Sequence, residues 1–308
     1  LLAGEILSQI SQPVATIHET GLVSLSSIFI IGLLVIYLSL RGKSLSDEKI
    51  RPLYARNLSE RLFLQAEVRA AREAQLRLMP EKLPNLPGLS IAAECRPARE
   101  VGGDFYDIYR LDENRVAVIL ADSSSQGLGS ALSIAFAAGY LRPLVTGSLL
   151  GDNSPVEILR SLLNQVGRQF DQTGLTDPHS NNFDLGFLIA IIDRVDLTLH
   201  FARTGKYPSV RVATPNGVVS PVESVLSDIS ISTGVVEIST GQVVLFTTDG
   251  IERNSPGPDY LLNRLFPLQN SASLPQRVHN LIKQLATLAM ESGKDDDLTM
   301  VVISVEEY

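Results

Sequence analysis

The distribution of apolar residues divides the chain into three regions of different character. In the first, residues 22–40 carry no charged side chain and are dominated by Leu, Ile, Val and Phe. As a helix this run would be roughly 28 Å long, which is close to the hydrocarbon thickness of a bilayer. It is long for a buried helix, and no positively charged segment precedes it as in a signal peptide. We therefore predict a transmembrane helix over residues 22–40.

The charges on either side of this helix predict its orientation. Basic side chains follow it at Arg41, Lys43, Lys49 and Arg51, whereas the preceding segment carries Glu5, His18 and Glu19. Lys and Arg are enriched on the cytoplasmic side, so we expect a single-pass protein of the cell membrane with everything after Leu40 in the cytoplasm. Residues 1–21 are then extracytoplasmic. Because the chain begins at Leu1 rather than Met, an equal interpretation is a truncated segment with sensor domains upstream.

The second region, residues 41–80, is charged and rich in helix formers, and we interpret it as a helical linker. A stripe with alternating spacings of four and three runs through Leu64, Val68, Ala71, Gln75 and Leu78. The stripe is shorter than the heptad series of an established coiled coil. The stripe therefore fits two interpretations equally. One is a coiled coil that forms a homodimer, and the other is an amphipathic helix packed on its own domain. Pro80, Pro84 and Pro87 mark the end of the linker.

In the third region, residues 81–308, short apolar runs alternate with turns. Strands are expected at Leu89–Cys95, Arg115–Ala121, Leu185–Ile192, Thr198–Arg203, Ser209–Ala213, Val243–Thr247 and Leu298–Val305. Helical spacing is found at Ser130–Val145, Ser154–Phe170 and Leu274–Ser292, and Gln172–Asn182 has the composition of an exposed loop. Several strands follow one another between residues 185 and 248, which disfavours a parallel doubly wound sheet. We predict an antiparallel α/β sandwich.

Composition narrows the chemistry available to this domain. The net charge of -8 and the pI near 5.1 argue against nucleic-acid binding driven by charge. A single cysteine, Cys95, excludes an intrachain disulfide, and four scattered histidines provide no zinc-ligand spacing. A metal site in this chain would therefore have to use oxygen ligands.

Four aspartates lie where the predicted strands begin or end: Asp104, Asp122, Asp249 and Asp296. Each one alone fits an ordinary turn or helix cap. Asp122, Asp249 and Asp296 follow or precede strands so apolar that these should be central and buried. Adjacent strand ends would bring the carboxylates close to one another, and a divalent cation removes the cost of placing such like charges together.

The segments around these aspartates resemble, in order, the signature of PP2C-type (PPM) bacterial serine/threonine protein phosphatases of the RsbU/SpoIIE group. They are Arg-Pro-Ala-Arg-Glu-Val-Gly-Gly-Asp-Phe-Tyr-Asp (96–107), Ala-Asp-Ser-Ser-Ser-Gln-Gly (121–127), Thr-Thr-Asp-Gly-Ile-Glu (247–252) and Asp-Asp-Leu-Thr (296–299). The likeness covers residues 78–305. It implies an α+β fold, a four-layer α-β-β-α sandwich of two antiparallel sheets flanked by helices, here preceded by the transmembrane helix and the linker.

The resemblance also implies a mechanism and a set of ligands. Two Mn²⁺ or Mg²⁺ ions would be held by Asp104, Asp122, Asp249 and Asp296 and by the backbone carbonyl of Ser123. A hydroxide bridging the metals would attack phosphoserine or phosphothreonine on a signalling protein, an anti-sigma factor antagonist by resemblance. Asp297 is a neighbour without an assigned role. Arg96 and Arg99 are candidates for the arginine that contacts phosphate in eukaryotic relatives, and the substrate-binding residues are otherwise unassigned.

Two departures from the family pattern keep a second interpretation open. Ser125 and Gln126 replace a glycine and a lysine, and Gly205-Lys206-Tyr207-Pro208 replaces a Gly-His-Pro-like turn. The alternative is a catalytically weak, phosphatase-like module that docks a signalling partner. A diguanylate cyclase is disfavoured because Phe105 replaces the glutamate of its Gly-Gly-Asp-Glu-Phe hairpin. A dinucleotide loop is disfavoured because Leu132 occupies its third glycine position.

The linker suggests how a signal would reach the site. The predicted helix Ser130–Val145 follows closely on Asp122. Rotation or dimerisation of residues 44–79 would shift this helix and thereby assemble the metal site.

Overall fold

The computed structural model describes residues 29–41, 57–123, 127–147, 154–173, 185–214, 217–219, 221–226, 231–265, 273–293 and 296–307. It divides into two compact units, Leu1–Glu67 and Val68–Tyr308. One helix covers Phe29–Arg41 with every residue exposed, and another covers residues 57–76, followed by a turn over residues 77–79. The remainder of the predicted transmembrane helix, residues 22–28, and the linker residues 42–56 lie outside the described residues.

The larger unit contains two antiparallel sheets. The five-stranded sheet has the order β1 (Leu89–Arg96), β11 (Leu298–Val305), β10 (Val243–Thr247), β6 (Ser209–Thr214) and β7 (Gly217–Val219). The six-stranded sheet has the order β2 (Phe105–Arg110), β3 (Arg115–Ser123), β4 (Leu185–Asp193), β5 (Thr198–Thr204), β9 (Ile231–Glu237) and β8 (Ser224–Leu226).

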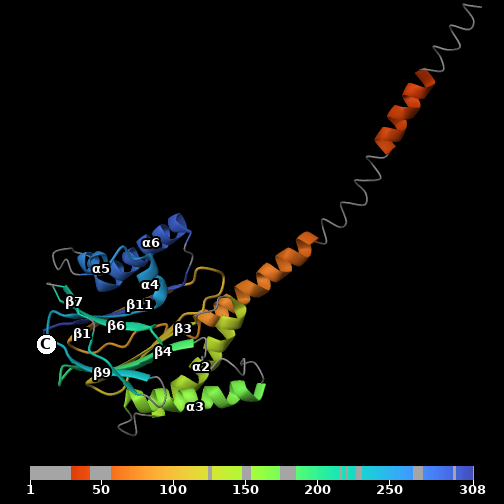
Figure 1. Ribbon diagram of the computed structural model, residues 1–308. Helices are drawn as coiled ribbons and strands as arrows, with labels where there is room; N and C mark the ends of the chain where they lie inside the picture. Colours follow the sequence, from red (N-terminus) through yellow and green to blue (C-terminus); the bar gives the residue numbers. More distant parts are fainter. Residues whose placement is uncertain are drawn as a thin grey trace, which may run out of the picture. The chain divides into compact units, whose positions relative to one another are not determined.

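Helices cover the outer faces of both sheets (Figure 1). The six-stranded sheet is covered by α2 (Leu128–Gly147) and α3 (Pro155–Thr173). The five-stranded sheet is covered by α4 (Asp249–Asn254), α5 (Pro258–Leu265) and α6 (Leu274–Ser292). The predicted α+β class, with two antiparallel sheets and helices, is confirmed.

Every strand and helix expected in this domain is present, although the sequence pattern missed β2, β7, β8, β9, α4 and α5. Residues 172 and 173 of the expected loop belong to α3, and the rest of that loop lies outside the described residues. Within the described residues, one helical stretch, Leu128–Val145 of α2, is long and apolar enough to cross a membrane, and 39% of it is buried inside the domain. Core helices pass the same test of length and composition.

Burial on both faces explains why the central strands are continuously apolar. In β11, Leu298, Met300 and Val302 pack in the core cluster beneath α6, whereas Val301, Ile303 and Val305 belong to the cluster between the sheets. The same alternation occurs in β10 and follows from the two-residue period of a strand. Strands of this kind belong in the interior of a sheet, and their ends are therefore fixed in position.

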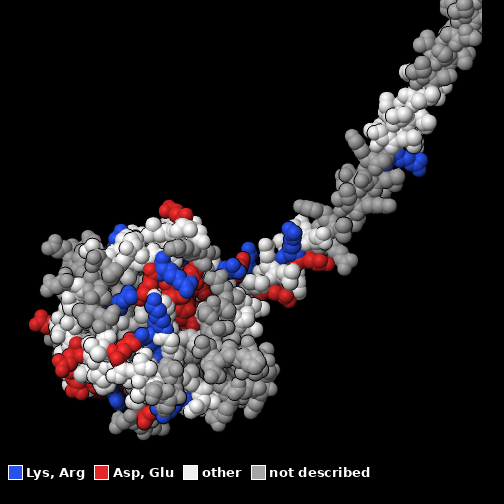
Figure 2. All heavy atoms as spheres, in the orientation of Figure 1, with Lys and Arg blue, Asp and Glu red and all other residues white. Residues whose placement is uncertain are grey.

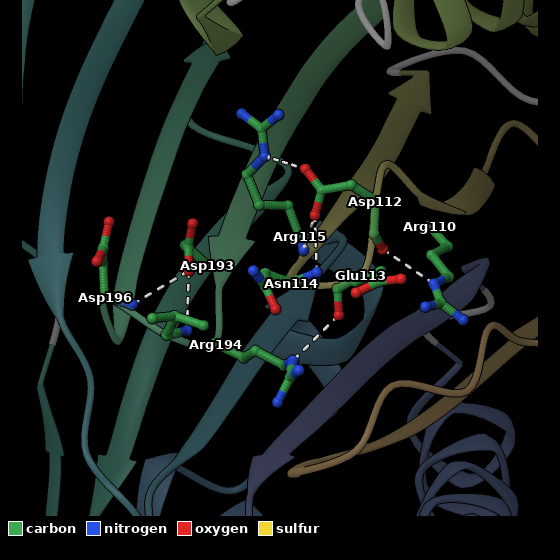
Figure 3. A network of polar contacts seen from close by, with 9 residues as sticks. Arg110, Asp112, Glu113, Asn114, Arg115, Asp193, Arg194 and Asp196 are labelled. Carbon is green, nitrogen blue, oxygen red and sulfur yellow. Dashed lines mark hydrogen bonds and ion pairs between the residues drawn. The ribbon is translucent and has the colours of Figure 1, made fainter.

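The end of the six-stranded sheet remote from Asp122 is tied by a network of turns (Figure 3). Asp112 accepts hydrogen bonds from the amide of Asn114 and from the amide and Nε of Arg115, at 2.6–2.8 Å. Arg194 reaches from the next turn to donate its amide to the carbonyl of Asn114 at 3.0 Å. These bonds fix the β3–β4 register, in which Arg115 pairs with Asp193 and Asp122 pairs with Gly186.

Candidate metal and catalytic site

The structure brings the predicted aspartates together at one end of the sandwich. Asp104 immediately precedes β2, Asp122 lies near the end of β3, and Asp249 begins α4 after β10. Asp296 and Asp297 precede β11. Since β2 pairs with β3 and β10 pairs with β11, each sheet contributes two adjacent strand ends. All of these residues are at least partly buried.

Two hydrogen bonds join the carboxylates of one sheet to the other sheet. The hydroxyl of Thr248, which follows β10, donates to Oδ2 of Asp104 at 2.7 Å. The amide of Asp249 donates to Oδ2 of Asp122 at 3.1 Å. The sequence assigned no role to Thr248, although it lies in the segment 247–252. Its side chain is fully buried, and its partner lies 144 residues away in the sequence.

Burial, and then the charge of neighbouring carboxylates, raise the pKa values of the clustered aspartates. Burial, with smaller contributions from Asp122 and Asp297, raises the pKa of Asp104 well above its usual range. Burial and the charge of Asp249 raise the pKa of Asp122 to about 7. The pKa of Asp249 is also raised, first by burial and then by Asp296, while Arg253 opposes the change. Burial and the proximity of like charges therefore both disfavour the ionised forms of these carboxyl groups.

Asp297, to which the sequence assigned no role, orders the loop before Asp104. Its two carboxylate oxygens accept hydrogen bonds from the amides of Ala98 and Gly103, at 2.7 and 2.5 Å. Gly102 lies against the same carboxylate, where a larger residue would collide with it. The amide of Ser123 donates to the carbonyl of Gly103 at 3.0 Å, which places Ser123 beside this loop. Residues Ser124 to Gln126, including the departures at Ser125 and Gln126, lie outside the described residues.

Gln75 holds the same loop from the other side. Its Nε2 donates to the carbonyl of Gly102 at 2.6 Å, and its Oε1 accepts from the Gly102 amide at 3.1 Å. The sequence placed Gln75 in an apolar stripe, and the structure shows a buried amide that satisfies both backbone groups of one glycine.

The Gly-Lys-Tyr-Pro departure lies next to the aspartates. The carbonyl of Tyr207 packs against Gly186, the residue that pairs with Asp122. The Tyr207 hydroxyl donates to Oε2 of Glu252 at 2.6 Å, and Ser209 donates to Oε1 at 2.9 Å. Burial and the bond to Glu252 raise the pKa of Tyr207 to about 12, so the phenol remains a donor. This loop is fixed against α4.

Basic side chains gather beside the acidic group, near α4 and the adjacent strand ends (Figure 2). Arg253, which the sequence pattern did not single out, pairs with Oδ2 of Asp249 at 2.7 Å and with Oδ2 of Asp296 at 3.0 Å. The one sequence signal for this contact is the spacing of four residues between Asp249 and Arg253. That spacing brings two side chains together only in a helix, and the sequence did not predict α4. Arg96 and Arg99, the candidates from the sequence, are both exposed.

The donor set fits hard divalent cations in its chemistry. Carboxylate oxygens are the ligands that Mg²⁺ and Mn²⁺ prefer, and a bound cation would offset the burial and charge repulsion that raise the pKa values of Asp104 and Asp122. Among the described residues, however, no three His, Cys, Asp or Glu side chains form a closed set of metal ligands. Thr248, the Asp249 amide and Arg253 contact oxygens of these carboxylates instead.

Solved structures with the same fold include PP2C phosphatase domains. The SiaA-PP2C domain of Pseudomonas aeruginosa aligns with a TM-score of 0.60 at 18% identity, over 79% of this chain and 98% of that domain. The PP2C phosphatase domain of SpoIIE from Bacillus subtilis, solved with a fragment of its regulatory domain, aligns with a TM-score of 0.54 at 16% identity, over 72% of this chain and 64% of the other. The RsbU and RsbW domains of Rv1364c from Mycobacterium tuberculosis align with a TM-score of 0.53 at 20% identity, over 73% and 62% of the two chains.

A family model described as Stage II sporulation protein E (SpoIIE) matches residues 112–306, which is more than half of the chain. The chain belongs to this family of PP2C-type proteins, and the predicted resemblance is confirmed. Protein IcfG of Synechocystis sp. is 23% identical over 262 residues, covering 77% of this chain. The chain spans 41% of the length of IcfG and 62% of the solved Rv1364c chain.

Proposed function

We propose that the chain is a metal-dependent protein phosphatase that hydrolyses phosphoserine or phosphothreonine on a signalling protein. The observation that best supports this is the convergence of Asp104, Asp122, Asp249, Asp296 and Asp297 at one end of the sandwich, where burial and like charges raise the pKa values of the first three. Membership of the SpoIIE family supports the same reaction.

In this proposal Asp104, Asp122, Asp249 and Asp296, with the carbonyl of Ser123, hold two Mn²⁺ or Mg²⁺ ions. Bound ions of this kind neutralise charge on a phosphoryl group and lower the pKa of water. The protein's own part is to position the ligands. Thr248 orients Asp104, the Asp249 amide orients Asp122, and Asp297 holds the loop that precedes Asp104.

The experiment is hydrolysis of p-nitrophenyl phosphate and of a phosphoserine protein, with and without Mn²⁺. We expect Mn²⁺-dependent turnover that falls at least about 100-fold in Asp122→Asn and in Asp249→Asn. Asp196→Asn is a matched control, since Asp196 is an exposed aspartate at the remote end of the same sheet. Equal rates in all three variants would contradict the proposed site.

The second candidate function is a binding module that docks a phosphorylated partner with little or no turnover. The lack of a closed three-ligand set among the described residues favours it, as do the substitutions at Ser125 and Gln126. The same experiment separates the two functions. A folded protein that shows no Mn²⁺-stimulated hydrolysis while binding a phosphoprotein supports the module.

We further propose that the substrate is a phosphorylated anti-sigma factor antagonist in a partner-switching pathway. In support, one solved relative contains RsbU and RsbW domains. Incubating the full chain with a panel of phosphorylated regulators tests this. Selective dephosphorylation of an antagonist protein is expected, and indiscriminate activity on the panel would contradict it.

We also propose that residues 22–40 anchor the protein in the cell membrane and that residues 41–80 link this anchor to a cytoplasmic catalytic domain, residues 81–308. The uncharged run and its basic flank support this arrangement. Resistance of the full chain to carbonate extraction tests the anchor, and protease access from the cytoplasmic side tests the orientation.

The linker is proposed to transmit a signal by rotation or dimerisation. Deletion of residues 44–79, or insertions that change the helical phase, should change the rate of hydrolysis. Unchanged activity in all of these variants would exclude this role of the linker.

A further inference from the structure

Arg253 bridges two of the proposed metal ligands with its two terminal nitrogens. NH2 contacts Oδ2 of Asp249 at 2.7 Å, and NH1 contacts Oδ2 of Asp296 at 3.0 Å. The two carboxylates come from different segments, one from the start of α4 and one from the residues before β11. The arginine side chain is 61% exposed, so its guanidinium lies where the aspartate cluster opens to solvent.

Stability alone gives little reason for this arrangement. An exposed ion pair contributes little to folding, because solvent screens it and the long side chain loses rotamer freedom. Two arginines of β5 and β6 pair with glutamates and are more buried. Arg211 pairs with Glu252 and Arg203 with Glu223, and their side chains are only 25% and 15% exposed. Arg253 is thus the accessible one of these three guanidinium groups.

A positively charged side chain beside the aspartate cluster would help a phosphoryl group to bind there. A phosphoryl group that approaches the cluster meets several carboxylates of its own sign, at Asp104, Asp122, Asp249, Asp296 and Asp297. A guanidinium presents parallel N–H donors in a planar fork that matches two oxygens of a phosphoryl group. If the carboxylates of Asp249 and Asp296 held divalent cations, they would no longer need Arg253 as a partner, and its guanidinium would be available to a bound phosphoryl group.

We propose that Arg253 binds the phosphoryl oxygens of the substrate, exchanging its ion pairs with Asp249 and Asp296 for that group. This inference rests on the proposed phosphatase function and assigns a substrate-binding residue to it. It also replaces Arg96 and Arg99, which the sequence suggested for this role.

The test uses the full chain, with binding measured separately from turnover. Titration calorimetry first gives the affinity for Mn²⁺ and then the affinity of the Mn²⁺-saturated protein for inorganic phosphate. Hydrolysis of p-nitrophenyl phosphate gives KM and kcat. The variants are Arg253→Gln, Arg253→Lys, Arg96→Gln and Arg99→Gln. Arg264→Gln is the matched control, because Arg264 stacks on Tyr260 and bonds to Gln284 on the neighbouring helices α5 and α6.

We expect Arg253→Gln to weaken phosphate binding and raise KM by about ten-fold or more, the usual scale for a charge-assisted hydrogen bond. Mn²⁺ affinity should stay equal or become tighter, since the variant removes a cation that competes for the same carboxylates. Arg253→Lys should recover part of the loss, because it keeps the charge without the fork. Arg264→Gln should match the wild type.

Several results would overturn this assignment. The first is an unchanged phosphate affinity in Arg253→Gln. The second is a loss of phosphate affinity that is fully explained by weaker Mn²⁺ binding. The third is a larger loss of phosphate affinity in Arg96→Gln or Arg99→Gln than in Arg253→Gln. Wild-type protein that binds Mn²⁺ and phosphate without turnover contradicts the phosphatase proposal alone, and the phosphate affinities still decide the role of Arg253. Wild-type protein that binds Mn²⁺ but no phosphate contradicts the role of Arg253, and failure to bind Mn²⁺ contradicts both.

Discussion

The backbone amide of Asp249 donates a hydrogen bond of 3.1 Å to Oδ2 of Asp122, joining the first turn of α4 to the end of β3. Asp122 belongs to a strand of the six-stranded sheet and Asp249 follows β10 of the five-stranded sheet, so this bond joins the two sheets at the site. It favours the ionised form of Asp122. Burial and the charge of Asp249 outweigh it, and the pKa of Asp122 is raised to about 7. In the metal-free protein, the ionised form of Asp122 is therefore less favourable in the folded state than in the unfolded state.

Replacing Asp122 by asparagine should stabilise the metal-free protein near neutral pH. The folded-state pKa of about 7 exceeds the unfolded value of about 3.9, so the folded state binds more protons at Asp122 between these values. Its contribution to stability therefore falls as the pH rises from about 4 to about 7. An asparagine at this position does not ionise, and we expect Asp122→Asn to raise the free energy of unfolding by about 1–3 kcal/mol at about pH 8.

Urea denaturation of the chelator-treated protein at about pH 5 and about pH 8 measures this effect. The advantage of Asp122→Asn should shrink at the lower pH, where wild-type Asp122 is largely protonated. Asp196→Asn, at the remote end of the sheet, should show no such dependence. An equal advantage at both pH values would show that ionisation of Asp122 is not its cause.

Adding Mn²⁺ should reverse the order of stability. Wild-type protein should gain stability with metal concentration, about 2.7 kcal/mol when free Mn²⁺ is 100 times its dissociation constant. Asp122→Asn lacks one proposed ligand and should gain much less. Differential scanning fluorimetry over a Mn²⁺ titration gives both curves, with Ca²⁺ as a second cation. Parallel curves for the two proteins would remove Asp122 from the ligand set.

Asp296 and Asp297 are adjacent but should respond differently to substitution. Asp297 accepts the amides of Ala98 and Gly103, so Asp297→Ala leaves two backbone donors without their partner. We expect a loss of about 2–4 kcal/mol of stability in the metal-free protein. Asp296→Ala should cost much less stability and mainly reduce Mn²⁺ affinity. Urea denaturation and calorimetry of both variants test this contrast, which a reversed pattern would contradict.

The sequence predicted the elements that are determined locally. β3, β4, β10 and β11 are continuous apolar runs, and such runs become central strands because both of their faces are buried. Asp122, Asp249 and Asp296 could be predicted for the same reason, since they lie where three of these runs begin or end. Asp104 instead precedes β2, which the sequence pattern missed. The convergence of these aspartates at one end follows from the strand order.

What the sequence missed depends on tertiary contacts. β2 contains Asp107, and a charged residue in a short run is typical of the surface. In the structure Asp107 is buried, and its carboxylate contacts Tyr109 and Arg142 of α2. α4 has only six residues, too few to show a helical period, and Arg253 could not be placed without it. Gln75 fitted an apolar stripe by spacing, and only the fold reveals Gly102 as its partner.

Gly250 is required because the backbone approaches it closely. A methyl group at this position would overlap the carbonyl oxygen of Asp297, and no side-chain movement can relieve that overlap. We expect Gly250→Ala to destabilise the protein by about 2 kcal/mol or more and to lower Mn²⁺ affinity by displacing Asp249 or Asp296. Gly139→Ala is the matched control. Gly139 is exposed on α2 with open space around it, so alanine should stabilise that helix by about 1 kcal/mol. Thermal unfolding of both variants tests the difference, and similar melting temperatures would contradict it.

Gln75 connects the helix of residues 57–76 to the loop that presents Asp104. Its amide bonds both backbone groups of Gly102, at 2.6 and 3.1 Å, and is buried. Gln75→Ala would leave this carbonyl and this amide without partners, at a cost of about 2–4 kcal/mol. Because Gly103 and Asp104 follow directly, the same variant should also weaken Mn²⁺ binding.

Glu73→Ala is the control for Gln75→Ala, because Glu73 lies on the same helix and is exposed. It should leave stability within about 0.5 kcal/mol of the wild type and Mn²⁺ affinity unchanged. Gln75→Glu gives a further comparison, since it keeps an acceptor for the Gly102 amide but sets a carboxylate against the Gly102 carbonyl. Its stability should fall as the pH rises through the titration of that carboxylate, because the ionised form has no donor there. If Gln75→Ala lost stability without any change in Mn²⁺ affinity, the contact would be a structural tie only, without influence on the position of Asp104.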